Sequence, residues 1–200
     1  MNRRLLVAGM AAGLAFAQPG WAQLTNRYVV KNNAGAAAPY DSWANAAGDI
    51  QTAIDYAYTA AGSTVIVAAA VYDTGGQVRA GRWLTNRVHI SKAITVQSAD
   101  NDPATAIIQG AWDPVYTNGP AAVRCVWMYP NARLIGFTLA NGATVKTNEV
   151  DPPTRSQIGQ DGEGGGVYAP ETTCVVSNCI IVNNRSDGDE VNGPGAGGVY

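Results

Sequence analysis

The chain has 200 residues, which is enough for one domain with a hydrophobic core. Hydrophobic residues make up 46% and charged residues only 14%, while Gly (23) and Pro (10) are frequent. This composition argues against disorder and against helical bundles or coiled coils, which are rich in charged residues and Leu. The net charge of −2 gives no basic surface for nucleic acid, so no nucleic-acid partner is expected.

Residues 1–22 have the pattern of a secretory signal peptide. Arg3 and Arg4 precede an apolar stretch at 5–17, and Ala22 provides the small residue before a cleavage site. The apolar stretch is shorter than the roughly 20 residues that span a bilayer, and no later segment is apolar enough. Cleavage after Ala17, or a buried N-terminal helix, are the alternatives. We therefore expect a protein that is secreted or held in the cell envelope, outside the cell, as a monomer.

The part that follows divides into an extended lead-in at 23–47, with a short strand at 28–31, and a domain at 48–200. A helix is expected at 49–61, with Asp49 as its N-cap and Gly62 as its C-cap. Its apolar side chains recur at helical spacing. They are Ile50, Ala53, Ile54, Ala57 and Ala61.

After Gly62 the chain shows short strands, each bounded by Gly, Asn, Asp or Pro. They are expected at 63–67, 87–90, 93–97, 106–109, 123–128, 134–139, 167–168, 175–182 and 199–200.

Internal repeats give the strongest indication of the architecture. Gly-Gly-Val-Tyr at 165–168 recurs at 197–200, a step of 32 residues, and residues 133–141 match residues 175–183 with a step of 42. The second match aligns Leu134 with Val176 and Leu139 with Ile181, and residues 93–98 resemble a weaker, earlier copy. Repeats built only of short strands and turns indicate a solenoid, in which each strand pairs with its equivalent in the next coil. The predicted helix would cover an open end of such a solenoid, and Asn at matching turn positions could form a ladder.

Several segments carry a family resemblance. Asp-Ile-Gln-Thr-Ala-Ile-Asp at 49–55, Gly-Ser-Thr-Val-Ile-Val at 62–67 and Val-Tyr-Asp at 71–73 resemble the entry into a parallel β-helix of the pectin lyase-like type. Residues 86–88, 92–98, 108–110, 123–126, 136–142 and 177–179 resemble secreted bacterial β-helix proteins of the choice-of-anchor Q group. The resemblance covers roughly residues 28–200. It implies an all-β fold, a right-handed parallel β-helix with an N-terminal amphipathic capping helix, and export. Because the chain stops within a repeat at Tyr200, we expect further C-terminal coils.

Two acidic loops are candidates for a Ca²⁺ site, because each precedes a Gly-Gly-Val-Tyr strand and stacking would bring both to one edge. Hard oxygen ligands on Gly-rich loops suit Ca²⁺. The candidate ligands are Asp161, Glu163, Asp187, Asp189 and Glu190. Solvated turns are the alternative, and no other cofactor is expected.

Aromatic side chains in and beside the first coils are candidates for binding a polysaccharide or a cell-surface glycan, since exposed aromatics stack on sugar rings. The candidates are Trp83, Trp112, Tyr116 and Trp127, with Tyr129 nearby. Burial beneath loops is the alternative.

Residues that could support catalysis form no recognisable motif. His89 is the only histidine, and it is expected to be a surface or packed residue on a strand. The arginines at 79, 82, 87, 124 and 133 could accept a proton or bind a sugar carboxylate, but structural contacts are the alternative. Cys125, Cys174 and Cys179 fit small buried residues, one disulfide with a leftover thiol, or a reactive thiol.

These observations favour a non-enzymatic extracellular solenoid that mediates adhesion, recognises glycans or serves as a scaffold. A polysaccharide lyase or glycoside hydrolase acting on acidic polysaccharide is the alternative, because parallel β-helices also carry such enzymes, although fold alone does not define function.

Overall fold

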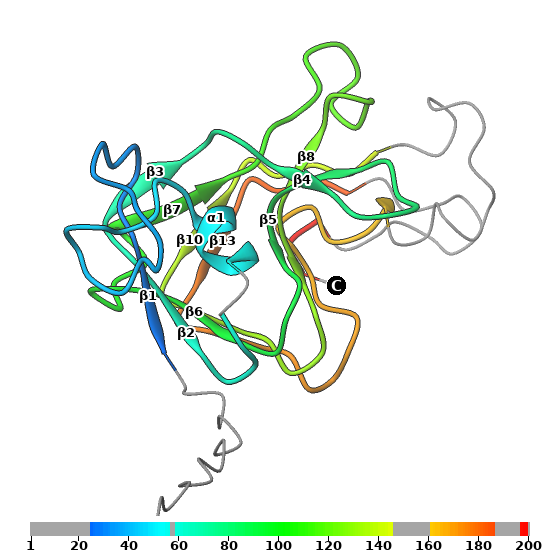
Figure 1. The fold of residues 1–200 in the computed structure, drawn as a ribbon. Helices are drawn as coiled ribbons and strands as arrows, with labels where there is room; N and C mark the ends of the chain where they lie inside the picture. The colour runs from blue at the N-terminus through cyan, green and yellow to red at the C-terminus, as the bar shows by residue number, and fades with distance from the viewer. Residues whose placement is uncertain (1–24, 57–58, 146–160, 187–196, 200) are drawn as a thin grey trace, which may run out of the picture.

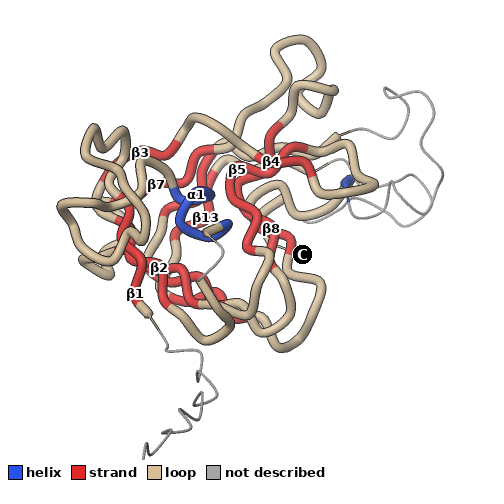
Figure 2. Tube along the Cα trace, viewed as in Figure 1, coloured by secondary structure: helices blue, strands red, loops and turns tan. Residues whose placement is uncertain are grey.

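The computed structural model describes residues 25–56, 59–145, 161–186 and 197–199. The chain winds into a β-solenoid of about four turns. Three sheets enclose a common interior, and Figure 1 looks along it with the first coil toward the viewer. The strands line the coil on three sides, as Figure 2 shows, while loops form its corners.

Each sheet is built from equivalent strands of successive coils. Sheet A has the order β1 (Asn26–Val29), β2 (Thr64–Val67), β6 (Thr95–Ser98), β9 (Arg133–Ile135) and β12 (Val175–Ser177). Sheet B has the order β3 (Ala70–Tyr72), β7 (Ala106–Gln109), β10 (Thr138–Ala140) and β13 (Ile180–Val182). Sheet C has the order β4 (Gln77–Val78), β5 (Thr85–Ile90), β8 (Val123–Met128) and β11 (Val167–Tyr168). All pairs are parallel except β4 with β5, so the predicted parallel solenoid is confirmed.

The sequence repeats correspond to neighbouring coils. Leu134 pairs with Val176 and Leu139 with Ile181, as the 42-residue step predicted. Val167 forms a parallel bridge with Val199, as the 32-residue step predicted. The repeats therefore predicted strand register as well as fold class.

Two runs predicted as single strands each divide into two. Gly136, with φ of 79°, separates β9 from β10, and Asn178, with φ of 49°, separates β12 from β13. Both residues adopt the left-handed region, which Gly tolerates and Asn tolerates better than most residues. The chain turns sharply at these points from sheet A into sheet B. The apolar run continues through the turn, which is why periodicity alone did not reveal it.

Inward-facing side chains form the core in columns along the solenoid. In β2, β5 and β7 alternate residues are buried, so one face of each of these strands packs inside. The columns include Val65, Val96 and Leu134 in sheet A, Tyr72, Ile108 and Leu139 in sheet B, and Val88, Val126 and Val167 in sheet C.

The helix α1 (Ile50–Asp55) is shorter than the expected 49–61. Asp49 caps its N-terminus as predicted, accepting a hydrogen bond from the Thr52 amide at 2.8 Å. At its other end, Lys92 Nζ donates to the carbonyls of Ile54 and Tyr56 at 2.6 and 3.1 Å. These bonds satisfy carbonyls exposed by the early end of the helix. Gly62 lies in a later turn instead of at the helix terminus.

The three cysteines form no disulfide. Cys125 is fully buried, and burial raises the pKa of its thiol to about 12. Such a thiol stays protonated and unreactive at neutral pH. Cys125 therefore behaves as a small packed side chain.

Within the described residues, no helix has the length and apolar character needed to cross a membrane. The expected signal peptide, residues 1–22, lies outside the described residues.

Candidate functional site

The corners of the solenoid differ in length. The connections from sheet A to sheet B are short and comprise residues 68–69, 99–105, 136–137 and 178–179. The connections from a strand of sheet B to the next parallel strand or bridge of sheet C are residues 73–84, which include β4, and residues 110–122, 141–166 and 183–198. We call these four segments the long-loop corner, and Figure 1 shows their described parts leaving the same side of the solenoid. Residues 146–160 and 187–196 lie outside the described part of the chain.

Three of the four predicted aromatic candidates lie on the long-loop corner. Trp83 is 47% exposed in the first connection, and Trp112 and Tyr116 are 39% and 59% exposed in the second. Trp127 differs, because it lies in β8 and is only 4% exposed. Its ring contacts His89 edge-on, with 4.7 Å between centroids, and the Arg79 guanidinium carbon lies 4.4 Å from the same ring. The structure therefore leaves Trp127 without an exposed stacking face.

Asp113 organises the second connection. Its Oδ1 accepts hydrogen bonds from the amides of Val115 and Tyr116 at 2.8 and 2.9 Å, and its Oδ2 accepts one from Ala121 at 2.9 Å. These bonds favour the ionised form and lower the pKa of the Asp113 carboxyl below its ordinary 3.8. A Cβ at Gly119 would lie 2.5 Å from the Asp113 carboxyl carbon, so only glycine fits there. Asp113 is thus a turn residue that holds Tyr116 in place.

Further contacts join the connections to one another. Asn118 Nδ2 in the second connection donates to the carbonyl and the hydroxyl of Thr144 in the third, both at 3.1 Å. The Arg185 guanidinium carbon in the fourth lies 4.4 Å from the ring centroid of Trp112. Covering one face of an indole with a cation favours a fixed ring orientation. The described parts of the corner therefore form a connected surface.

The acidic candidates are only partly described. The Oδ2 of Asp161 accepts a hydrogen bond from the Trp83 amide at 3.0 Å, and Asp161 is 6% exposed. Asp161 thus joins the first connection to the third. Asp187, Asp189 and Glu190 lie outside the described residues. Among the residues that the structure describes, no group of three or more His, Cys, Asp or Glu side chains could hold a metal ion. A Ca²⁺ site remains a prediction.

Arg124 supports the Gly-rich segment that follows Asp161. It is fully buried, and its Nε and Nη2 donate to the carbonyls of Gly164 and Glu163 at 3.0 and 2.7 Å. Its Nη1 donates to Asn86 Oδ1 at 2.9 Å. Burial lowers the pKa of Arg124 to about 10, against the opposing attraction of Asp161. These contacts favour the structural interpretation of Arg124.

The other arginine candidates are dispersed. Arg87 Nε donates to the Gln109 carbonyl at 2.7 Å, and its Nη1 donates to the Gly75 carbonyl. Arg133 is exposed in sheet A, away from the long-loop corner. Arg79 lies over Trp127, and Arg82 belongs to the first connection. Of these four arginines, Arg82 is adjacent in sequence to Trp83, whose amide bonds to Asp161.

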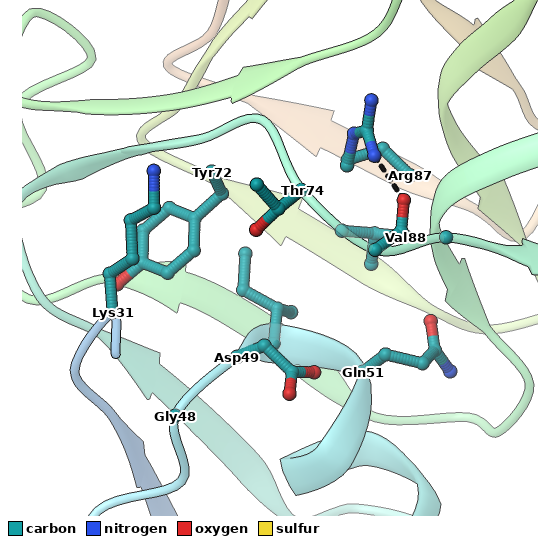
Figure 3. A pocket seen from close by; sticks show the side chains of 11 residues that line it. Lys31, Gly48, Asp49, Gln51, Tyr72, Thr74, Arg87 and Val88 are labelled. Atoms are coloured by element: carbon teal, nitrogen blue, oxygen red, sulfur yellow. Dashed lines mark hydrogen bonds between the residues drawn. The ribbon is translucent and has the colours of Figure 1, made fainter. Parts of the chain in front are cut away.

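A small cavity lies between α1, the end of β3 and β5. Its lining includes Lys31, Asp49, Gln51, Tyr72, Thr74 and Arg87, shown in Figure 3. Its volume of about 30 Å³ is room for roughly two water molecules and is too small for a sugar ring. Lys31 Nζ contacts Asp73 Oδ1 at 2.5 Å beside it, and burial raises the pKa of Tyr72 to about 12. This cavity is not a glycan site.

Two contacts between coils have no signal in the sequence: Arg185 with Trp112, and Asp161 with the Trp83 amide. The strand register would have placed their connections side by side, but the orientation of side chains within long loops has no periodic signal. No protein-family model, curated protein or solved structure matches this chain.

Proposed function

We propose that this protein is an exported, non-enzymatic β-solenoid that binds glycans through the long-loop corner. One observation carries the proposal: Trp83, Trp112 and Tyr116 are large, exposed aromatic side chains in consecutive connections of the same corner. An exposed aromatic face offers apolar contact to the C–H groups of a sugar ring. Extracellular adhesion or attachment to a glycan-bearing surface follows from such binding.

The contacts beneath these side chains support the proposal. Asp113 fixes the backbone at Tyr116, and Arg185 packs against Trp112. The Trp83 amide is bonded to Asp161, which fixes the backbone that carries the indole. A surface that is ordered before binding loses less conformational entropy when the ligand arrives.

We also propose the finer description of the fold, a right-handed parallel β-helix of the pectin lyase-like type in which α1 caps the N-terminal end. Parallel β-strands joined by crossovers are right-handed in about 98% of cases. The apolar residues Ile50, Ala53 and Ile54 of α1 pack into the same core cluster as the strands of the first coils. A helix in this position would cover core residues that an open end exposes.

Binding of the mature protein to a panel of neutral and acidic polysaccharides tests the proposal. We expect binding that Trp83→Ala, Trp112→Ala and Tyr116→Ala each weaken about tenfold, a change of about 1.4 kcal/mol in binding free energy. Trp43→Ala is the matched control for Trp83→Ala, because Trp43 is 46% exposed and lies outside the corner. Tyr129→Ala, at 45% exposure, is the control for Tyr116→Ala. Equal losses in the controls, or no binding across the panel, would contradict the proposal.

Cleavage is measured in the same panel, with and without Ca²⁺, by assaying new reducing or unsaturated ends. Cleavage that disappears with Asp161→Asn, Glu163→Gln or Arg82→Gln would establish the alternative function, a polysaccharide lyase or hydrolase. Binding without cleavage is the outcome expected here.

A further inference from the structure

Trp127 occupies an outward-facing position of sheet C and is nevertheless buried. Along β8, Val126 and Met128 belong to the core cluster, so Trp127 between them points to the outer face of the sheet. Its register partners in the neighbouring coils are His89 and Tyr168, which flank it along that face. Because Trp127 is only 4% exposed, another part of the chain must lie over its ring.

The first connection supplies a cover for this ring. The Arg79 guanidinium carbon lies 4.4 Å from the Trp127 ring centroid, which is a cation–π contact. Arg79 directly follows β4, and its carbonyl accepts a hydrogen bond from the Arg82 amide at 3.0 Å, which closes a tight turn. Trp83 comes directly after this turn and is exposed. One turn of the chain therefore separates the residue that covers Trp127 from an exposed stacking candidate.

The chain after this turn is firmly held. The Trp83 amide donates to Asp161 Oδ2 at 3.0 Å, which ties it to the third connection. Leu84 is fully buried and packs in a small cluster with Ala122 and Ala143 from the second and third connections. The backbone that carries Trp83 thus stays in place if the preceding residues move.

The chain before the turn has a weaker attachment. Among the described strands, β4 pairs only with β5, and it is two residues long. Its Gln77 side chain adds bonds to Asp55 and His89, at 3.2 and 2.9 Å. Gly75 and Gly81 stand on either side of the segment, with φ of 73° and 74° and open space around them. Because glycine changes its backbone angles at little steric cost, these two positions can serve as hinges for the segment between them.

We propose that Arg79 is a removable cover and that Trp127 is a further sugar-stacking face of the long-loop corner, available when Arg79 moves away. A sugar ring that stacks on Trp127 takes the place of the guanidinium, beside the ring of Trp83. Because only the uncovered fraction of the protein binds through Trp127, the cover lowers the apparent affinity for the glycan. The ligand in this proposal rests on the glycan function, whereas the cover is a property of the folded chain alone.

The cover is tested by NMR without any glycan. The indole signals of Trp127 are assigned by their loss in Trp127→Phe, and their relaxation by a soluble, neutral paramagnetic chelate is measured. We expect this relaxation to be several-fold stronger in Arg79→Ala than in the unchanged protein. Arg133→Ala is the matched control, because Arg133 is exposed in sheet A, and it should leave the signals unchanged. Signals that stay equally shielded in Arg79→Ala would overturn the proposal.

The stacking face is tested with a polysaccharide that the unchanged protein binds. We expect Arg79→Ala to bind it about two- to fivefold more tightly, the factor that corresponds to losing one competing cation–π contact. The gain should vanish in Arg79→Ala/Trp127→Leu, because leucine keeps the apolar bulk but offers no ring face. Equal or weaker binding by Arg79→Ala would show that Trp127 is not a sugar face.

Two further outcomes are distinguishable. If the double variant does not fold, the comparison of Arg79→Ala with the unchanged protein decides on the stacking face. If neither the unchanged protein nor Arg79→Ala binds any polysaccharide, the glycan function and the stacking face both fail, and the NMR measurement still decides whether Arg79 covers Trp127.

Discussion

The corner between sheets A and B and the long-loop corner are stabilised in different ways. At the first, Gly136 and Asn178 occupy equivalent left-handed positions in successive coils. The Gly136 amide donates to the Ser177 carbonyl at 3.1 Å, and Asn178 Nδ2 donates to the Asn101 carbonyl at 2.6 Å. The last two coils therefore share the same turn at this corner.

The long-loop corner repeats only near the ends of its connections, where Asn141 and Asn183 have φ of 57° and 55° and Gly-Gly at 165–166 recurs at 197–198. Asp113 orders one connection from within, Arg124 holds another from the solenoid interior, and Asp161 bonds to the backbone of a third. Three of the four connections are thus held by different side chains. The corner between sheets A and B depends on backbone turns that stack, whereas the long-loop corner depends on side chains that differ from one connection to the next.

Replacing Arg124 should have the largest effect on stability. Arg124→Met leaves Asn86 Oδ1 and the carbonyls of Glu163 and Gly164 without their buried donor. We expect a loss of about 3–5 kcal/mol in the free energy of unfolding, measured by urea denaturation. Arg133→Met is the control, because Arg133 is exposed, and should change stability by about 0.5 kcal/mol or less. Similar losses in the two variants would contradict the role given to Arg124.

Two glycines with similar φ allow a direct comparison of the corners. Gly136 has φ of 79° and a Cβ there would lie 2.7 Å from Ser98 Oγ, whereas Gly81 in the long-loop corner has φ of 74° and open space around it. Both alanine variants suffer left-handed backbone strain of about 1–2 kcal/mol. We expect Gly136→Ala to lose about 1–3 kcal/mol more than Gly81→Ala, because it also overpacks the stacked turn. Equal losses in denaturation would show that stacking at Gly136 is not tight.

Asp113→Ala should act locally. The amides of Val115, Tyr116 and Ala121 lose their acceptor, so we expect their hydrogen exchange to accelerate while the core strands keep their protection. Because the pKa of Asp113 is lowered, its contribution is present above about pH 3.8 and is lost as the pH falls through the lower folded value. Global unfolding of the variant at neutral pH would contradict a local role.

The smallest effect is expected for Lys31→Met. The Lys31–Asp73 ion pair is exposed, and exposed pairs contribute little and are screened by salt. We expect the denaturation midpoint to stay within experimental error. A clear loss would mean that Lys31 matters through its bond to the Val71 carbonyl.

The sequence predicted the parallel solenoid, most strands and the register of the later coils, because side-chain alternation and repeats are local signals. It missed β3 and β4, whose few residues lack a repeat partner along the chain. The sequence pattern predicted that α1 continues to residue 61, because the apolar spacing continues past Asp55. In the structure the helix ends at Asp55, and Lys92 Nζ donates to the Ile54 carbonyl.

The candidate site was only partly predictable. Trp83, Trp112 and Tyr116 are exposed. Their exposure agrees with their positions next to turn residues in the sequence. Trp127 has the same residue type and lies on a strand, yet it is buried beneath Arg79 and against His89. Trp127 is buried because the first connection places Arg79 over its ring, and sequence patterns do not indicate where that connection lies.

The antiparallel pairing of β4 has a consequence for how molecules of this protein meet. A solenoid end with bare parallel strands is a template on which a neighbour can add its own strands and polymerise. At the first coil, β4 is short and runs the opposite way, and β1 is bonded along its outer side to Tyr40 and Ala47. Among the described residues, the outer edges of sheets A and C at the first coil are therefore less suited to pairing with a parallel strand of a neighbouring molecule.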